Sequence, residues 1–123
     1  MRSLQRDLEA VDATESGFGS VVSVAVKHLN IKTTAAQEYI RVALANALLM
    51  DRKQQDYGAG NIAKFGTFGI IVRLTDKFER LKNLFGQGRK RRAINESIED
   101  TLRDISNYAI IALIVEQGRW PKE

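Results

Sequence analysis

Apolar residues recur at helical spacing along two charged stretches near the C-terminal end of the sequence, and this periodicity limits the fold more than any other feature. Within residues 68–85 the apolar positions advance by three or four residues at a time, which is the spacing of one face of an α-helix. The same spacing continues through Ile98, Leu102 and Ile105 in the second stretch. Both stretches are therefore predicted to be long amphipathic helices.

The segment between these two helices predicts that they form a hairpin. It contains Gly86 and Gly88 followed by four consecutive cations, and so short a connection favours antiparallel packing of its neighbours. Asn95 is the expected N-cap of the second helix, since asparagine side chains accept hydrogen bonds from a helix's first amide groups. Residues 109–115 are apolar all round the helix, so this half is expected to be central to the core.

The rest of the chain also favours helices. Thr34 and Gln37 resemble a capping box, so a helix is predicted over about residues 35–55. Residues 20–29 fit either a strand or a helix, and helix is favoured because no second strand is present to pair with the first. A short helix over residues 4–12 would end at a glycine-rich break at residues 16–19. The prediction is an all-α bundle of four to five helices with a C-terminal antiparallel helix hairpin, forming a single domain over residues 1–123. Residues 1–33 would be an N-terminal extension and residues 34–118 the helical core.

Composition excludes several kinds of site. The sequence has no cysteine and one histidine, which removes disulfides, thiolate zinc sites, cysteine nucleophiles and multi-histidine metal sites. A divalent ion would have to be held by carboxylate and carbonyl oxygens, which favours magnesium or manganese. Residues 60–67 are glycine-containing but lack the Gly-Lys-Ser/Thr of a P-loop.

The hydrophobic segments predict no contact with a membrane. The longest apolar run, residues 109–115, is far shorter than the roughly 20 residues of a membrane-spanning helix. The N-terminal residues carry acids and no apolar stretch, unlike a signal peptide. We therefore expect a cytoplasmic protein, in a bacterium or a phage-infected cell.

Charged side chains line one side of each hairpin helix. Positions three, four and seven apart stack along a helix, and antiparallel packing would bring Arg73 near Asn107 and Asp104. Arg80 would lie nearer Asp100 and Glu96. One interpretation is a set of solvated interhelical ion pairs, each contributing only about 0–1 kcal/mol. The alternative is a cleft in which acids hold a divalent ion while Arg73, Lys77 and Arg80 bind phosphate oxygens. Tyr108 would be a core tyrosine or stack on a base.

The formal charge of +4 comes from one loop. Arg89, Lys90, Arg91 and Arg92 supply four of the 19 basic residues, and the remaining 15 balance the 15 acids. Four adjacent cations are able to hold nucleic-acid phosphates or attract an acidic protein, or to be only a soluble turn. No aromatic residues are interleaved with them, as single-strand binders usually require.

Several motifs together resemble a known family. They are Asp56-Tyr57-Gly58, then Gly66 and Gly69, then the runs at residues 73–84 and 95–111. Over residues 35–117 the sequence resembles the nucleotide modification associated domain 1 family, small all-helical proteins common in bacteriophages. The resemblance implies a phage-type protein linked to nucleotide or DNA-base metabolism.

A more distant similarity is to the all-α nucleoside triphosphate pyrophosphohydrolases of the MazG and dimeric dUTPase type. Those enzymes bind magnesium through paired acidic motifs on neighbouring helices. Here Asp76 and Glu79 stand in for the first motif. For the second, Asp100 and Asp104 are four residues apart, while Glu96 and Glu99 keep the spacing of three without the final aspartate. The similarity implies a magnesium-dependent nucleotide hydrolase and a homodimer; the competing hypothesis is a non-enzymatic module acting on a host protein or nucleic acid through residues 89–92.

The candidate residues follow from the charged faces and these similarities. The candidate catalytic residues are Asp76, Glu79, Asp100 and Asp104, which together with Glu96 are the candidate magnesium ligands. The candidate nucleotide-binding residues are Arg73, Lys77, Arg80, Asn107 and Tyr108.

Overall fold

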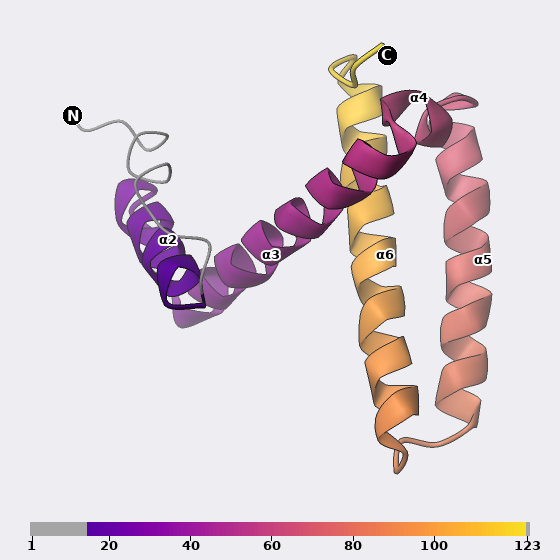
Figure 1. Cartoon of the computed structure of the whole chain (residues 1–123), viewed down its shortest axis with the longest axis horizontal. Coiled ribbons are helices and arrows are strands. Elements are labelled where there is room, and N and C mark those ends of the chain that lie inside the picture. The colour runs from indigo at the N-terminus through magenta and orange to yellow at the C-terminus, as the bar shows by residue number, and fades with distance from the viewer. Residues whose placement is uncertain (1–14, 123) are drawn as a thin grey trace. The chain divides into compact units, whose positions relative to one another are not determined.

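The computed structural model describes residues 15–122, and in this part of the chain all regular structure is helical. In chain order the helices are α2 (Glu15–His28), α3 (Thr34–Tyr57), α4 (Ala59–Ile62), α5 (Gly66–Gly86) and α6 (Arg92–Glu116) (Figure 1). The predicted all-α class is confirmed. The helix predicted over residues 4–12 lies outside the described residues.

Packing divides the chain into two units, residues 1–48 and 49–123, with the boundary inside α3. In the described part of the first unit, Val22 and Ala25 on α2 are buried. The helical assignment of residues 20–29 is confirmed. The break predicted at residues 16–19 is wrong, because α2 continues through Gly17 and Gly19; glycine lowers helix stability but does not by itself end a helix. The prediction of one domain over residues 1–123 stays a prediction.

The ends of α3 are set by two local features. At its start, the Thr33 hydroxyl oxygen accepts a hydrogen bond of 3.2 Å from the Ala36 amide. Thr33 therefore serves the capping function that the sequence assigned to Thr34, which is the first helical residue. At its end, Gly58 has a φ of 74° and a ψ of 163°, a positive-φ backbone conformation that glycine adopts without a steric cost and that does not continue a helix.

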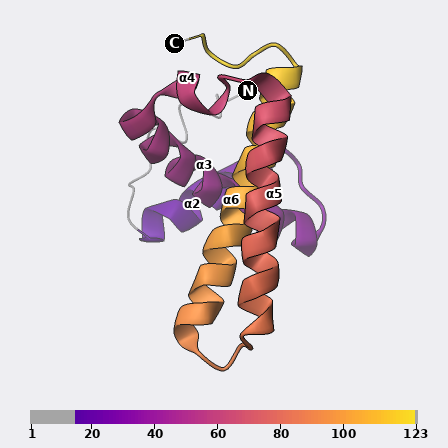
Figure 2. The same ribbon diagram turned by 90° about the vertical axis from the view of Figure 1, so that its right-hand side faces the viewer.

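The second unit is organised around α5 and α6, which run antiparallel and side by side (Figures 1 and 2). The predicted hairpin is therefore confirmed. One buried cluster, Ile62, Ile70 and Ile111, lies beside α4. A second buried cluster lies nearer the connecting loop, and its members are Leu84, Ile94 and Ile98. The Trp120 indole N–H donates a 2.9 Å hydrogen bond to the Ala59 carbonyl, which attaches the residues after α6 to α4.

Two predictions about α6 are wrong. The helix begins at Arg92, so Asn95 lies inside it and does not cap it. The apolar half at residues 109–115 is also not buried all round: Ile111 is 3% exposed, whereas Leu113 is 61% exposed. The physical reason is that α5 covers one side of α6 and leaves apolar side chains on its other sides exposed. Among residues 15–122, none of the helices combines the length and the apolar composition that a membrane-spanning helix requires.

Candidate functional site

A pocket of about 280 Å³ lies within the second unit, where the end of α3, α4, α5 and α6 meet. Its wall combines cations, amides, aromatic rings and aliphatic side chains from all four helices. The lining residues are Met50, Lys53, Gln54, Tyr57, Gly58, Asn61, Ile62, Arg73, Lys77, Asp104, Asn107, Tyr108 and Ile111.

The α3 wall of this pocket follows from helical spacing. Met50, Gln54 and Tyr57 are separated by four and three residues, so their side chains share one face of α3. Gly58 closes the helix, and its amide donates a 2.8 Å hydrogen bond to the Gln54 carbonyl. The chain then turns into α4, which adds Asn61 to the same wall.

One carboxylate joins two lysines at the centre of the site. The Nζ atom of Lys53 lies 3.0 Å from Oδ1 of Asp104, and the Nζ atom of Lys77 lies 3.0 Å from Oδ2. Burial by itself raises the pKa of Asp104, but the hydrogen bonds and charges of both lysines outweigh it and leave the pKa below its usual 3.8. Asp104 is therefore ionised at neutral pH.

The remaining polar groups surround this ion-pair cluster. Nη2 of Arg73 lies 3.5 Å from the Asn61 carbonyl oxygen. Asn107 is only 8% exposed and lines the pocket. Three cations and one carboxylate line the pocket, which therefore has a net charge of +2 at neutral pH. A pocket of this charge, with amide and phenol groups in its wall, is suited to an anionic ligand that also carries polar ring atoms.

The hairpin brings together five of the residues expected at the site. Arg73 lies near Asp104 and Asn107, as antiparallel pairing predicts. Arg80 does not reach the pocket, and its Nε donates a 3.3 Å hydrogen bond to the buried Thr101 hydroxyl instead. The predicted residues that line the pocket are Arg73, Lys77, Asp104, Asn107 and Tyr108.

The candidate magnesium ligands are dispersed. Three of the five carboxylates form ion pairs with a cation on the same helix: Glu79 with Lys82 at 3.2 Å, Glu96 with Arg92 at 2.9 Å and Asp100 with Arg103 at 3.6 Å. Asp76 is exposed on α5, and Asp104 is engaged with its lysines. Among residues 15–122 no group of three or more acidic or histidine side chains is placed to hold a metal ion. These residues do not fit a bound magnesium ion, and their catalytic and metal-binding roles stay predictions.

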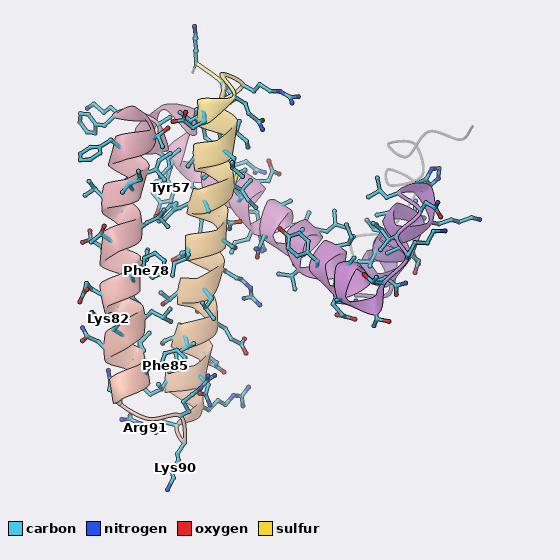
Figure 3. All side chains as sticks on the ribbon, turned by 180° about the vertical axis from the view of Figure 1, so that it is seen from behind. Tyr57, Phe78, Lys82, Phe85, Lys90 and Arg91 are labelled. Carbon is cyan, nitrogen blue, oxygen red and sulfur yellow. The ribbon has the colours of Figure 1, made fainter. Side chains whose placement is uncertain are left out.

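The four-cation loop is held by its neighbours. Nε of Arg89 donates a 2.9 Å hydrogen bond to the Asn95 side-chain oxygen, while the Asn95 amide donates one of 2.8 Å to the Arg89 carbonyl. The Arg89 guanidinium also lies 5.1 Å from the centre of the Phe85 ring, within range of a cation–π interaction. Lys90 and Arg91 are at the hairpin tip, whereas Tyr57 of the pocket is near the hairpin's other end (Figure 3).

Sequence reasoning missed the α3 and α4 contributions to the pocket. Lys53, Gln54, Tyr57 and Asn61 were not among the candidate residues, although all four line the pocket. The 50, 54, 57 spacing was a usable signal, since it places polar groups beside an apolar residue on one helix face. Nothing in the spacing indicates that this face meets Asp104, because that contact joins residues 53 and 104 in the folded chain.

Comparison with known protein families gives a match that covers most of the pocket. Residues 53–115 match the model of the family described as nucleotide modification associated domain 1. No curated protein and no solved structure matches the chain. This matched range is shorter at both ends than the range of the resemblance in the sequence, residues 35–117. It includes every residue that lines the pocket except Met50. As the match spans more than half of the sequence, the chain belongs to the nucleotide modification associated domain 1 family.

Proposed function

We propose that this chain binds a nucleotide in the pocket between α3, α4, α5 and α6, as part of phage-type nucleotide or DNA-base metabolism. The observation that carries the proposal is the convergence of Lys53, Arg73 and Lys77 on a pocket with one carboxylate. Arginine binds phosphate oxygens with a planar pair of donors and lysine acts as a point charge. The family's description, which refers to nucleotide modification, supports the same class of ligand.

The other end of the ligand would meet the uncharged part of the wall. Tyr57 and Tyr108 offer ring faces to a base, and Gln54 and Asn107 offer amide groups to its polar edge. The Gln54 Oε1 atom is buried and has no hydrogen-bond partner. A buried acceptor in this state is unfavourable, and rotation of the amide toward a bound base would give it a donor.

The proposal is restricted to binding. Magnesium-dependent cleavage remains a finer hypothesis, which the dispersed carboxylates do not support.

The test is isothermal titration of the chain with a panel of deoxynucleotides, using Lys77→Gln as the site variant. We expect saturable binding that Lys77→Gln weakens about tenfold, because a charge-assisted hydrogen bond contributes about 1.5–3 kcal/mol. Lys82→Gln is the matched control: it is the same substitution on the same helix, at an exposed lysine paired with Glu79. Absence of heat for every nucleotide, or equal weakening by both variants, would contradict the proposal.

A second candidate function is supported by the hairpin tip. Asn95 and Phe85 hold Arg89 in place, and Lys90 and Arg91 lie at the end of the hairpin (Figure 3). A positively charged tip of this kind suits contact with nucleic-acid phosphates or with an acidic host protein. This function needs neither the pocket nor any catalytic residue.

A further inference from the structure

The charge of the pocket sets a limit on the charge of its ligand. Lys53, Arg73 and Lys77 face a single acid, Asp104, so the net charge is +2. A phosphate monoester carries a charge of about −1.5 to −2 at pH 7, which nearly cancels that of the pocket. Each additional phosphate group would place excess negative charge beside the Asp104 carboxylate. An uncompensated charge in a partly buried site is unfavourable.

The small volume of the pocket also favours a ligand with few phosphate groups. At about 280 Å³, it lies at the lower end of the roughly 300–1,000 Å³ typical of small-molecule sites. Lys53 and Lys77 reach the same carboxylate from two helices, so these two cations are gathered around one point, and Arg73 lines the same small pocket. This arrangement suits one compact anionic group better than a chain of phosphates.

Magnesium usually accompanies di- and triphosphates in proteins. Magnesium held with substrate phosphates also needs one or two carboxylate ligands. The pocket has only Asp104, and both of its oxygens already contact lysines at 3.0 Å. The ion pairs of Glu79 and Asp100 are with cations of their own helices, so neither carboxylate is available in the pocket.

We infer that the pocket selects nucleoside monophosphates over the corresponding di- and triphosphates, without a magnesium ion. This inference rests on the proposed nucleotide binding and adds the ligand class. Asp104 is the residue that sets the limit, because its negative charge lowers the net charge of three cations by one. It also holds Lys53 and Lys77 together when no phosphate is bound.

The test is a comparison of the mono-, di- and triphosphates of one deoxynucleoside by isothermal titration, once with magnesium and once with EDTA. We expect the monophosphate to bind about tenfold more tightly than the triphosphate, as one uncompensated charge in a partly buried site is worth at least that factor. EDTA should leave the monophosphate affinity unchanged. Tighter binding of the triphosphate, or a requirement for magnesium, would overturn the inference.

Asp104→Asn gives the sharper test, because it raises the net charge of the pocket to +3 at almost constant shape. The preference should move by about tenfold toward the diphosphate. Asp51→Asn makes the same chemical change on α3, at an exposed carboxylate that accepts a hydrogen bond from Gln55 and does not line the pocket, and should leave the ratio of mono- to diphosphate affinities unchanged. Circular dichroism confirms folding. Should Asp104→Asn be unfolded, Lys77→Gln replaces it and should move the ratio toward the monophosphate.

The outcomes separate the two levels of the proposal. If no nucleotide and no inorganic phosphate binds, the proposed function fails and the inference fails with it. If all three nucleotides bind with equal affinity, or if changing the charge of the pocket leaves their ratio unchanged, nucleotide binding stands and only the monophosphate preference is overturned.

Discussion

Lys53 and Lys77 hold one carboxylate between them, each at 3.0 Å from a different oxygen of Asp104. The lysines belong to α3 and α5 and the carboxylate to α6, so this cluster links three helices of the second unit. All three residues line the pocket. Changing them should therefore alter both the stability of the fold and the binding of a ligand.

The first prediction concerns the pH dependence of stability. The pKa of folded Asp104 lies below 3.8, so its ion pairs stabilise the fold fully above that pH and lose this contribution as the pH falls through the lowered pKa. Asp104→Asn should reduce the free energy of unfolding by about 1 kcal/mol at pH 7. The deficit, measured by urea denaturation, should shrink as the pH is lowered below 3.8. Asp100→Asn is the control; an Asp104→Asn deficit independent of pH would contradict the prediction.

Gln54→Leu should separate binding from stability. Its Oε1 atom is buried without a hydrogen-bond partner, and replacing such a group by an apolar one of similar size is nearly neutral or stabilising. The free energy of unfolding should therefore stay within about 0.5 kcal/mol of the original or rise. Nucleotide affinity should fall about fivefold or more, because the base loses its amide partner. A loss of stability without a loss of affinity would show that Gln54 is only structural.

Ile70 and Ile71 provide a matched test of the hairpin core. Ile70 is 0% exposed and packs with Ile62 and Ile111, while Ile71 is 49% exposed. Ile70→Ala should lower the free energy of unfolding by about 2–5 kcal/mol, through lost burial and the cavity left behind. Ile71→Ala removes the same atoms from the next position and should cost well under half as much. Similar costs in chemical denaturation would mean that the α5–α6 packing described above is incorrect.

The hairpin tip distinguishes the two candidate functions. Replacing residues 89–92 together with serine removes four positive charges at the end of the hairpin remote from Tyr57 (Figure 3). Nucleotide affinity in the pocket should stay within about twofold, because exposed charges farther apart than about 10 Å are largely screened by salt. Retention of labelled single-stranded DNA or of an acidic peptide, measured by fluorescence anisotropy, should fall if the tip is the binding surface. A loss of nucleotide affinity with unchanged retention of DNA and of the acidic peptide would assign nucleotide binding to the tip instead of the pocket.

The homodimer expected from the sequence stays a prediction, and the exposed apolar residues of the hairpin make it testable. Phe78 and Phe85 on α5 and Leu102 on α6 are each about half exposed. Sedimentation equilibrium should give twice the 13.8 kDa chain mass, and Phe78→Ser should shift the chain toward monomer. Tyr39→Ser, at an exposed aromatic residue of α3, is the control. A monomeric mass for the unmodified chain at the concentrations used for titration would exclude the dimer.

Periodicity was a reliable guide wherever one helix packs on its immediate neighbour in sequence. Apolar spacing over residues 68–85 predicts α5 to within two residues at its start and one at its end, because a long amphipathic stripe has few other ways to be buried. The short loop then makes α6 antiparallel to α5, which places Arg73 beside Asp104 and Asn107. These contacts follow from register alone.

Side-chain partners were much less predictable. Asn95 is a residue type that commonly caps helices, yet its side-chain amide forms hydrogen bonds with Arg89. The helix starts at Arg92, three residues before Asn95. Glu79 and Asp100 looked like members of one acidic cluster, but each pairs with a cation three positions away on its own helix. Such pairs are neighbours on one helix face, and an exposed pair contributes less than about 1 kcal/mol, so alternative pairings differ little in free energy.

By itself, the sequence determined the helical class, the hairpin and the two charged faces, since these depend on spacing along single helices and on the length of one loop. Only the tertiary structure decided that Lys53 of α3 joins Lys77 and Asp104, and that the carboxylates do not gather around one point. The physical reason is that a pocket is formed by contacts between distant segments. Helical periodicity says which side of a helix is apolar, but it does not say which other segment will cover that side.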